Sequence, residues 1–366
     1  MIVVVKIGTS SITEADGTIR AEAVAKLSGE VAAAVADGHQ AVVVSSGAIG
    51  AGLPVLGFDQ GRPRDSVTLQ ALSAVGQSRL MALYQERLGG YGLVCGQVLL
   101  APRDFLERPQ YLHAQRTLNR LLKLGVVPIV NENDAVADDA IRWGDNDRIA
   151  ALVAHMVGAE LLVLLTDTEG VHTADPRSDA DARVIEEITD LSLLEELAGA
   201  AGGAGTDRGS GGMASKLAAA RIASLSGVRT VIGAAQRDRI VADALAGGPG
   251  AGTTVAAQPQ RLSARKLWIG FAMVPSGTVR VDAGARRAMV ERGASLLAIG
   301  ITGFEGVFQP GDAVDVRGPD DQVFARGLME VSSDDMNSVV GLRSDALPPG
   351  APDEVIHRDS LTVLPW

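Results

Sequence analysis

Short, almost continuously apolar runs alternate with longer Ala- and Leu-rich stretches through the first two thirds of the chain. The short runs are rich in Val, Ile and Leu, which is typical of parallel strands that are buried on both faces. We expect strands at Ile2–Val5, Ala41–Val44, Val126–Val130, Leu161–Leu165 and Arg229–Ile232, and helices at Ala21–Ala36, Thr68–Arg87, Tyr111–Leu124, Asp147–Val157 and Met213–Leu225. The alternation predicts an α/β fold with a mostly parallel sheet, helices on both faces and right-handed crossover connections.

The pattern changes near residue 250, where Gly and Pro residues crowd the segment Ala246–Thr254. Beyond it, short strand-like runs are separated by Gly and Asp turns, which is typical of a small β-rich domain. These runs are Gly277–Val281, Leu296–Gly300, Ala313–Val316 and Val323–Leu328. We therefore expect a first domain at residues 1–254, a linker at 255–273, a second domain at 274–352 and a C-terminal tail at 353–366.

Composition narrows the class of protein further. Only 3% of the 366 residues are aromatic, so aliphatic side chains must fill the core. The one cysteine, Cys95, excludes an intrachain disulfide, argues against a Cys-rich zinc site and, in its apolar run, should be a core residue. The net charge of −11, from 33 basic and 44 acidic residues, disfavours general nucleic-acid binding but leaves a local basic pocket possible. The sequence shows neither an apolar run long enough to span a membrane nor a basic leader, so we expect a soluble cytoplasmic protein.

Two lysines lie next to glycine-containing segments. Lys6 and Gly8 follow the first predicted strand, at the end where parallel sheets bind ligands. Lys216 lies in the first turn of a predicted helix, after Gly209–Gly212. Free backbone N–H groups, the helix dipole and a formal charge together can grip a phosphate. The alternatives are a solvated lysine at a strand end and an exposed lysine after a flexible loop; we expect Gly199–Gly212 to be mobile.

Polar turns follow other predicted strands. The small residues of Ser45–Gly52 leave room for a substrate and expose N–H groups, and Asp134 can pair with a substrate ammonium group. The carboxylates of Gly144–Asp147 can order cationic groups around a metal-bound nucleotide, and the pair Thr166-Asp167 can contact a nucleotide. Each segment could instead be an ordinary strand-to-helix turn or a helix N-cap. The five histidines show no metal-ligand spacing, so we predict no metal site made by the protein: His39, His113, His155, His172 and His357.

In their order and spacing, these motifs resemble those of the glutamate 5-kinases, a family of the amino-acid kinase superfamily, over about residues 1–255. The motifs are the Lys-Ile-Gly-Thr start, SSGAIGAG, NENDAV, GDND, LLTDTEGVHTADPR and GSGGM followed by Lys216. Residues 274–352 are similar to the PUA domain appended to many bacterial members. The sequence departs from the family's usual GTGGM loop at Ser210, which keeps a hydroxyl, and the segment 202–208 is longer and richer in Gly than usual.

The resemblance implies roles for individual residues. Lys6 and Lys216 would stabilise the transferred phosphoryl group, and Asp147 would hold the two lysines in place. Ser46, Asp134 and Asn146 would bind the acid substrate. The implied ATP-binding residues are Lys6, Thr166, Asp167, Ser210, Gly211, Gly212, Met213, Ala214, Ser215 and Lys216.

The implied reaction is ATP plus L-glutamate giving ADP and L-glutamyl 5-phosphate, the first step of proline biosynthesis, with Mg²⁺ accompanying ATP. A side-chain carboxylate is already ionised at pH 7, so it needs no general base. The resemblance also implies L-proline as a feedback inhibitor, a glutamyl-phosphate reductase as a partner and a homo-oligomeric assembly.

Two rival functions stay open at this point. The first is another acid kinase of the same superfamily, acting on aspartate or N-acetylglutamate; an acetylated substrate has no ammonium group and would not need Asp134, and an aspartokinase usually ends in a different type of regulatory domain. The second is RNA binding, which PUA domains often perform. Residues 271–366 hold 8 Arg and no Lys against 14 Asp and Glu, a balance of −6 that argues against a surface for a phosphate backbone.

Overall fold

The chain forms two compact units, Met1–Arg261 and Leu262–Trp366, which we describe separately. The structure is a computed structural model that describes the chain except for residues 15, 17, 59–61, 102, 137–145, 177, 180, 202–211, 249, 260, 261, 365 and 366. Among the described residues, no helix is both long and apolar enough to cross a membrane.

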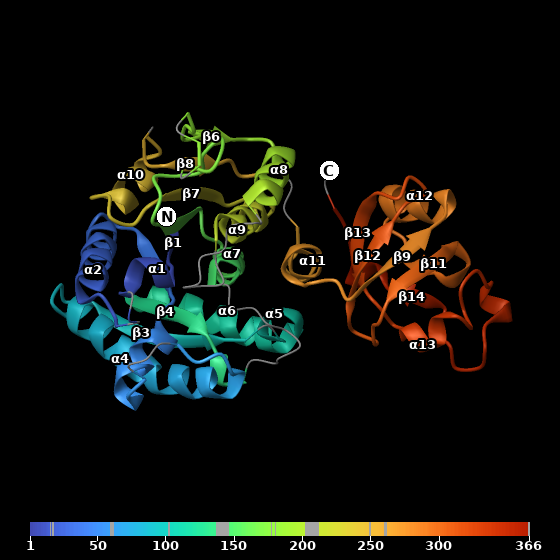
Figure 1. Ribbon diagram of the computed structural model, residues 1–366, viewed down its shortest axis with the longest axis horizontal. Coiled ribbons are helices and arrows are strands. Elements are labelled where there is room, and N and C mark those ends of the chain that lie inside the picture. Colours follow the sequence, from blue (N-terminus) through green and yellow to red (C-terminus); the bar gives the residue numbers. More distant parts are fainter. Residues whose placement is uncertain are drawn as a thin grey trace. The chain divides into compact units, whose positions relative to one another are not determined.

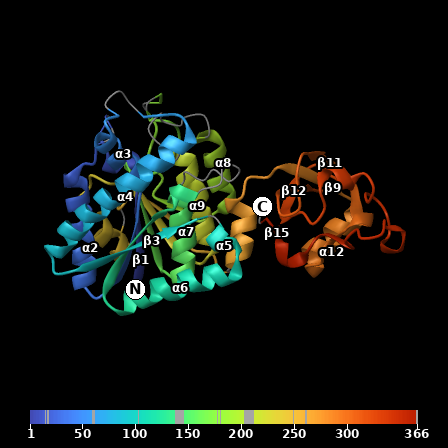
Figure 2. The ribbon, with the colours of Figure 1, turned by 90° about the horizontal axis from the view of Figure 1, so that it is seen from below.

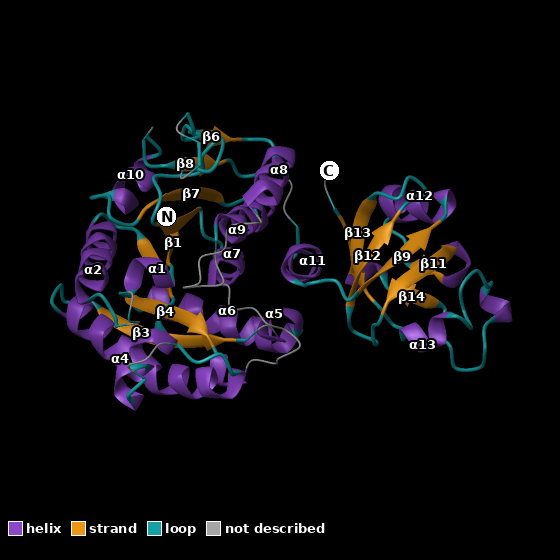
Figure 3. Ribbon diagram, viewed as in Figure 1, coloured by secondary structure: helices purple, strands orange, loops and turns teal. Residues whose placement is uncertain are grey.

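An eight-stranded sheet forms the centre of the first unit, in the order β3-β4-β2-β1-β5-β7-β8-β6 (Figure 1; Figure 3). Its strands are β1 (Ile2–Ile7), β2 (Gln40–Ser45), β3 (Val94–Leu100), β4 (Val126–Glu132), β5 (Leu161–Thr166), β6 (Glu187–Ile188), β7 (Arg229–Ala234) and β8 (Thr253–Val255). The β7–β8 pair is antiparallel, whereas the pairs that join β3, β4, β2, β1, β5 and β7, and the β6–β8 pair, are parallel. The predicted mostly parallel α/β sheet is confirmed.

Helices cover both faces of this sheet, as Figures 1 and 2 show. They are α1 (Thr9–Ile12), α2 (Ala21–Ala36), α3 (Ala48–Gly52), α4 (Ser66–Gly89), α5 (Arg103–Leu106), α6 (Arg108–Lys123), α7 (Asn146–Val157), α8 (Leu191–Ala201), α9 (Met213–Leu225) and α10 (Ile240–Ala246). Helices α2, α4 and α10 share one core cluster with the odd-numbered residues Val3, Val5 and Ile7 of β1. Successive side chains of a strand point to opposite faces, so Val4 and Lys6 face the other side, where α7 packs on β1.

The predicted boundaries hold best where a segment is buried on one or both sides. Helices α2 and α9 have the predicted limits, and the five strands predicted in the first unit are each extended by one or two residues. The prediction missed β3, a half-exposed strand at the sheet edge that carries Gly and Gln among its apolar residues, although Cys95 within it is buried as expected. The segment Gly199–Ala201, which we predicted as loop, is the last turn of α8, and residues 202–211 lie outside the described residues.

A five-stranded sheet in the order β11-β9-β12-β13-β15 and a two-stranded sheet β10-β14 form the second unit. The strands are β9 (Gly277–Val281), β10 (Leu296–Leu297), β11 (Ile301–Gly306), β12 (Ala313–Arg317), β13 (Val323–Leu328), β14 (Glu354–Ile356) and β15 (Leu361–Val363). Three helices, α11 (Ala264–Leu267), α12 (Ala283–Arg292) and α13 (Ser333–Met336), accompany them, and a π-helical turn spans Trp268–Ala272. The small β-rich domain is therefore confirmed.

The ends of this second unit differ from the predicted division. The segment predicted as a C-terminal tail supplies β14 and β15, and Val355 and Ile356 are fully buried in the core. Much of the predicted linker also belongs to the unit, because Leu267, Trp268 and Ile269 are fully buried. Burial of these apolar side chains stabilises both segments in the folded unit, although the composition around them predicts a linker and a tail. The predicted run Leu296–Gly300 is divided into β10 and a 3-10 turn before β11 begins.

Candidate active site

Lys6 is a buried lysine at the carboxyl end of the central strand β1. Both neighbours of β1 pair with it in parallel, and the alternation along the strand turns Lys6 towards α7. Only 3% of Lys6 is exposed. A lysine is almost never buried to this extent without a charged partner, which points to a carboxylate nearby.

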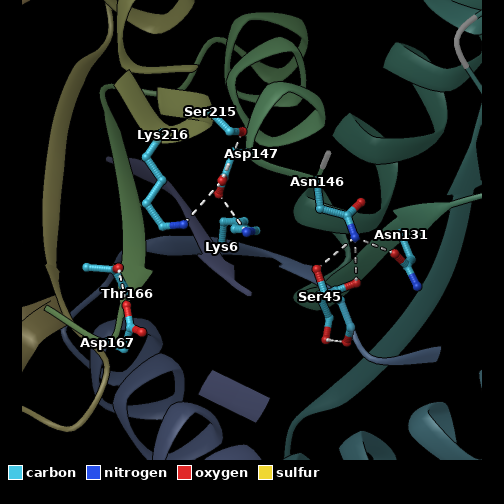
Figure 4. Close-up of polar contacts among 10 residues, drawn as sticks. Lys6, Ser45, Asn131, Asn146, Asp147, Thr166, Asp167, Ser215 and Lys216 are labelled. Carbon is cyan, nitrogen blue, oxygen red and sulfur yellow. Dashed lines mark hydrogen bonds and ion pairs between the residues drawn. The ribbon is translucent and has the colours of Figure 1, made fainter. Parts of the chain in front are cut away.

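That partner is Asp147, in the first turn of α7. Asp147 Oδ1 lies 2.6 Å from Lys6 Nζ, and Asp147 Oδ2 lies 3.3 Å from Lys216 Nζ and accepts a hydrogen bond from Ser215 Oγ at 3.2 Å (Figure 4). We call Lys6, Asp147 and Lys216 the lysine cluster. The structure thus brings together the three residues predicted as catalytic, from strand β1 and the first turns of α7 and α9.

The electrostatics of the lysine cluster follow from its burial. Burial by itself raises the pKa of Asp147, but the charges of Lys6 and Lys216 and their hydrogen bonds outweigh it and hold the pKa below its usual value. The carboxylate therefore stays ionised, and the three side chains carry one more positive than negative charge. Because the positive ends of the α7 and α9 dipoles add to this excess, the cluster favours an anion next to the two lysines.

A second group of polar side chains lies where β2, β4 and α7 meet. Asn146 Nδ2 donates to Ser46 Oγ at 3.0 Å, to Asn131 Oδ1 at 2.9 Å and to the Ser45 carbonyl oxygen at 3.5 Å. Figure 4 shows Asn146 and Asn131 side by side above Ser45. We call Ser46, Asn131 and Asn146 the amide cluster. Its members are neutral donors and acceptors, and no described residue bonds Asn146 Oδ1, although this atom is buried.

Asp134 lies three residues beyond Asn131, in the 3-10 turn η2 (Asp134–Val136). Its Oδ2 accepts a hydrogen bond of 2.5 Å from Ser73 Oγ, in α4. Burial raises the pKa of Asp134, while the Ser73 hydrogen bond and the charge of Arg62 lower it by less. Asp134 is thus a partly buried carboxylate, and a further cation placed against it would stabilise its ionised form.

The remaining predicted residues that the structure describes also lie at the carboxyl ends of the parallel strands or at the start of α9. Thr166 is the last residue of β5, which pairs with β1, and Asp167 follows it; Thr166 Oγ1 donates to Asp167 Oδ1 at 3.1 Å. Gly212, Met213, Ala214 and Ser215 form the N-cap and the first turn of α9. Ser210 and Gly211, as well as Gly144 and Asp145 of the GDND motif, lie outside the described residues.

Asn131 and Ser73 hydrogen-bond the predicted site residues Asn146 and Asp134, but neither was itself predicted from the sequence. Asn131 belongs to the NENDAV motif and ends a buried strand, which was a usable signal. Ser73 gives no such signal, since a serine on the buried stripe of a long helix looks like an ordinary core residue.

Comparisons with known proteins assign both parts of the chain to families. The sequence model of the Amino acid kinase family matches residues 1–233, and that of the PUA domain matches residues 277–348. The chain is 46% identical over 359 residues to the glutamate 5-kinase of Nocardia farcinica (strain IFM 10152), covering 98% of this chain and 96% of the relative. It is 42% identical over 368 residues to the glutamate 5-kinase of Caldanaerobacter subterraneus subsp. tengcongensis, covering 100% and 98%. The chain belongs to the glutamate 5-kinase family.

A solved structure supports the fold of this glutamate 5-kinase family member. The carbamate kinase from Giardia lamblia bound to AMP-PNP matches with a TM-score of 0.51 and 16% identity, over 70% of this chain and 98% of that chain. At this identity the match concerns the fold alone. The curated relatives support a glutamate 5-kinase and not the rival acid kinases or the RNA-binding protein that the sequence left open. The chain is therefore a kinase with an appended PUA domain.

Proposed function

We propose that this chain transfers the γ-phosphoryl group of ATP to the side-chain carboxylate of L-glutamate, giving ADP and L-glutamyl 5-phosphate. The observation that carries the proposal is the buried lysine cluster, which lies next to the amide cluster at one edge of the sheet. One cluster suits a phosphoryl group and the other suits a small polar acid. Asn146 and Asp147 are consecutive residues, so the start of α7 belongs to both.

The chemistry requires positioning and charge stabilisation more than proton transfer. A γ-carboxylate oxygen of glutamate forms a bond to the γ-phosphorus of ATP, the bond from that phosphorus to the β,γ-bridging oxygen breaks, and ADP leaves with the electron pair. No proton moves, since the carboxylate is ionised at neutral pH. Lys6 and Lys216 stabilise the negative charge on the transferred group, and Asp147 fixes both ammonium groups.

The acid substrate needs partners for its own charged groups. Asp134 pairs with the α-ammonium group, Ser46 contributes its hydroxyl, and the Oδ1 atom of Asn146 is an acceptor that a substrate N–H would satisfy. An N-acetylated acid would offer no ammonium group to Asp134. The site therefore suits a free amino acid.

The nucleotide lies, in this proposal, across the ends of β5 and β1 and the start of α9. Thr166 and Asp167 contact the nucleoside part, and the start of α9, from Gly212 through Ser215, supplies backbone N–H groups to the phosphates. Lys6 and Lys216 complete the ATP site.

Mg²⁺ would accompany ATP in this reaction and neutralise part of the phosphate charge. Within the described residues, no group of three or more His, Cys, Asp or Glu side chains could hold a metal ion, and Asp147 is engaged by two lysines. Magnesium in such enzymes is bound largely by substrate phosphates and water.

We further propose that L-proline inhibits the enzyme and that a reductase receives its product. L-Proline carries the same α-carboxylate and ammonium groups as glutamate, so it would compete for Asp134 and Asn146 without being phosphorylated. Acyl phosphates hydrolyse readily, which favours direct transfer to a glutamyl-phosphate reductase. We also propose a homo-oligomer and a cytoplasmic location, where ATP is available. Proline inhibition that rising glutamate does not relieve would contradict the shared site.

The substrate is tested by ADP release measured with L-glutamate, L-aspartate, N-acetyl-L-glutamate and carbamate, with hydroxylamine added to trap any acyl phosphate as its hydroxamate. We expect the highest kcat/KM with L-glutamate, together with hydroxamate formation that depends on it. A higher kcat/KM with any other acid would overturn the proposed substrate. ADP release without hydroxamate would reduce the activity to ATP hydrolysis.

A further inference from the structure

Helix α4 contacts both chain segments that form the acid site. Ser73, Gly76 and Tyr84 lie on its buried stripe, at the i, i+3 and i+11 positions that share one face. Ser73 Oγ donates to Asp134 beyond β4, and Tyr84 Oη is hydrogen-bonded to Ser45 Oγ at the end of β2, 2.9 Å away. One rigid helix therefore connects the β2 and β4 ends of the site.

Glycines let α4 pack backbone against backbone on α3, the short helix after Ser46. A Cβ atom at Gly76 would clash with the carbonyl oxygen of Ala48, and one at Gly52 would clash with that of Leu72. Leu72 immediately precedes Ser73, so the turn of α4 that carries the Ser73 hydroxyl is fixed by this close approach. Ser73 itself is only 2% exposed, which leaves its side chain little freedom.

The Ser73 hydroxyl donates to one of the two carboxylate oxygens of Asp134. Its hydrogen bond of 2.5 Å is to Asp134 Oδ2, which leaves Oδ1 for another donor. A hydroxyl that donates to a carboxylate favours the ionised form and holds the carboxylate plane in one orientation. A substrate ammonium group needs both properties, a negative charge and a fixed direction.

We propose that Ser73 is a positioning residue for substrate recognition, because its hydroxyl donates to the Asp134 carboxylate and orients it towards the α-ammonium group of the amino-acid substrate. The inference rests on the proposed function, since it assigns Asp134 to that ammonium group. Ser73 touches Asp134 and not the reacting atoms, so its effect is on binding of the acid and reaches the substrate only through Asp134.

The experiment is a double-mutant cycle in the full-length chain with Ser73→Ala, Asp134→Ala and the double variant. Ser78→Ala is the matched control, because Ser78 lies on the exposed side of the same helix and its hydroxyl bonds within the helix, to the Val75 carbonyl oxygen. The readouts are kcat/KM for L-glutamate at saturating ATP, which stays measurable when saturation with glutamate is out of reach, and the KM for ATP.

We expect Ser73→Ala to lower kcat/KM for L-glutamate about tenfold, the size expected for a lost hydrogen bond to a charged group, with little change in the KM for ATP. In the Asp134→Ala background the same substitution should have almost no further effect, because the group it positions is gone. Ser78→Ala should behave as the unsubstituted chain.

Three results would overturn the inference. The first is that Ser73→Ala leaves kcat/KM for glutamate unchanged. The second is that Ser73→Ala lowers this kcat/KM by the same factor in the unsubstituted chain and in the Asp134→Ala background, which would mean that Ser73 has a general structural role. The third is an unsubstituted chain that does not release ADP with glutamate, which removes the proposed function and the inference with it. The first two leave the proposed function intact, so the two failures are distinguishable.

Discussion

The lysine cluster and the amide cluster share the start of α7 but are built in opposite ways. In the lysine cluster three formal charges are buried, with side chains no more than 7% exposed. In the amide cluster the hydrogen bonds join neutral groups, Asn146 is only half-buried, and the nearby carboxylate of Asp134 lies in a separate turn. A buried charge acts strongly on a phosphoryl group whose charge changes during the reaction, whereas neutral groups suit selection of the α-ammonium and α-carboxylate groups of the acid, whose charges stay constant.

This difference predicts separate kinetic consequences. Changes in the lysine cluster should lower kcat and the stability of the fold, while changes around the amide cluster should raise the KM for the acid. Asn146 and Asp147 are consecutive, so the first turn of α7 sets how far the bound acid lies from the transferred group. Single substitutions in and around each cluster test whether the effects on kcat and stability can be separated from the effects on the KM for the acid.

The largest expected effect is on stability. Asp147→Asn removes the carboxylate that pairs with two buried lysines and should lower the free energy of unfolding by about 3–5 kcal/mol. The lysines hold the folded-state pKa of Asp147 below its unfolded value, so its stabilising contribution is present above the unfolded pKa and is lost as the pH falls through the folded pKa. Urea unfolding at neutral pH measures the difference.

The control for this variant is Asp243→Asn, which breaks an exposed pair with Arg237. An exposed ion pair contributes at most about 1 kcal/mol, so the control should unfold almost like the unsubstituted chain. Equal losses in the two variants would show that burial of Asp147 has no special energetic consequence.

The next effect is on turnover. Lys216→Ala removes one of the two cations beside the transferred group and should lower kcat on the order of 10²–10³-fold, by analogy with the loss of one oxyanion donor. Circular dichroism should show an intact fold. Lys123→Ala, at an exposed position near the end of α6, is the matched control and should leave kcat unchanged. A folded Lys216→Ala variant with nearly normal kcat would remove Lys216 from the chemical step.

A smaller effect is expected at Asp134. Asp134→Ala should raise the KM for L-glutamate about tenfold or more and leave the KM for ATP almost unchanged, since a contact that is equal in ground and transition states appears in KM. Burial raises the pKa of Asp134, so the unsubstituted chain should lose kcat/KM for glutamate on acidification at a higher pH than an ordinary aspartate would predict. The variant should lack this limb of the pH profile, and an equal rise in both KM values would contradict the assignment.

The smallest effect is expected from removing the second unit. The unit division lies between Arg261 and Leu262, and every proposed site residue lies between Lys6 and Lys216. A chain of residues 1–261 should therefore keep most of its glutamate-dependent ADP release. Gel filtration isolates the monodisperse fraction of this truncated chain, and its glutamate-dependent ADP release is then compared with that of the full-length chain. A folded but inactive truncation would mean that the second unit helps to build the site.

The sequence predicts those parts of the fold and the site that have a local signal. Helix α2 and strand β1 follow from apolar periodicity, and Lys6 and Lys216 follow from a lysine at a strand end and in a helix first turn. Asp147 was ambiguous, because an aspartate at a helix start is also an ordinary capping residue. What removes the ambiguity is its contact with Lys6, and this contact joins positions far apart in the chain.

Other parts could not be predicted because their cause is tertiary. Ser73 is one small polar residue on a buried helix stripe, and its hydrogen bond to Asp134 exists only because α4 packs against η2, the turn after β4. The predicted tail became β14 and β15 because Val355 and Ile356 fill a core that other strands create. The edge strand β3 was missed because a half-exposed strand does not show the continuous apolar run of a central one.

The most direct test of the separation between the clusters is the equilibrium binding of L-glutamate to the Lys216→Ala variant, measured by isothermal titration calorimetry in the presence of a non-hydrolysable ATP analogue. We expect a dissociation constant close to that of the unsubstituted chain, although kcat is lowered on the order of 10²–10³-fold. A dissociation constant weakened by the same factor as kcat would contradict it, because the lysine cluster would then bind the acid and not act on the transferred phosphoryl group.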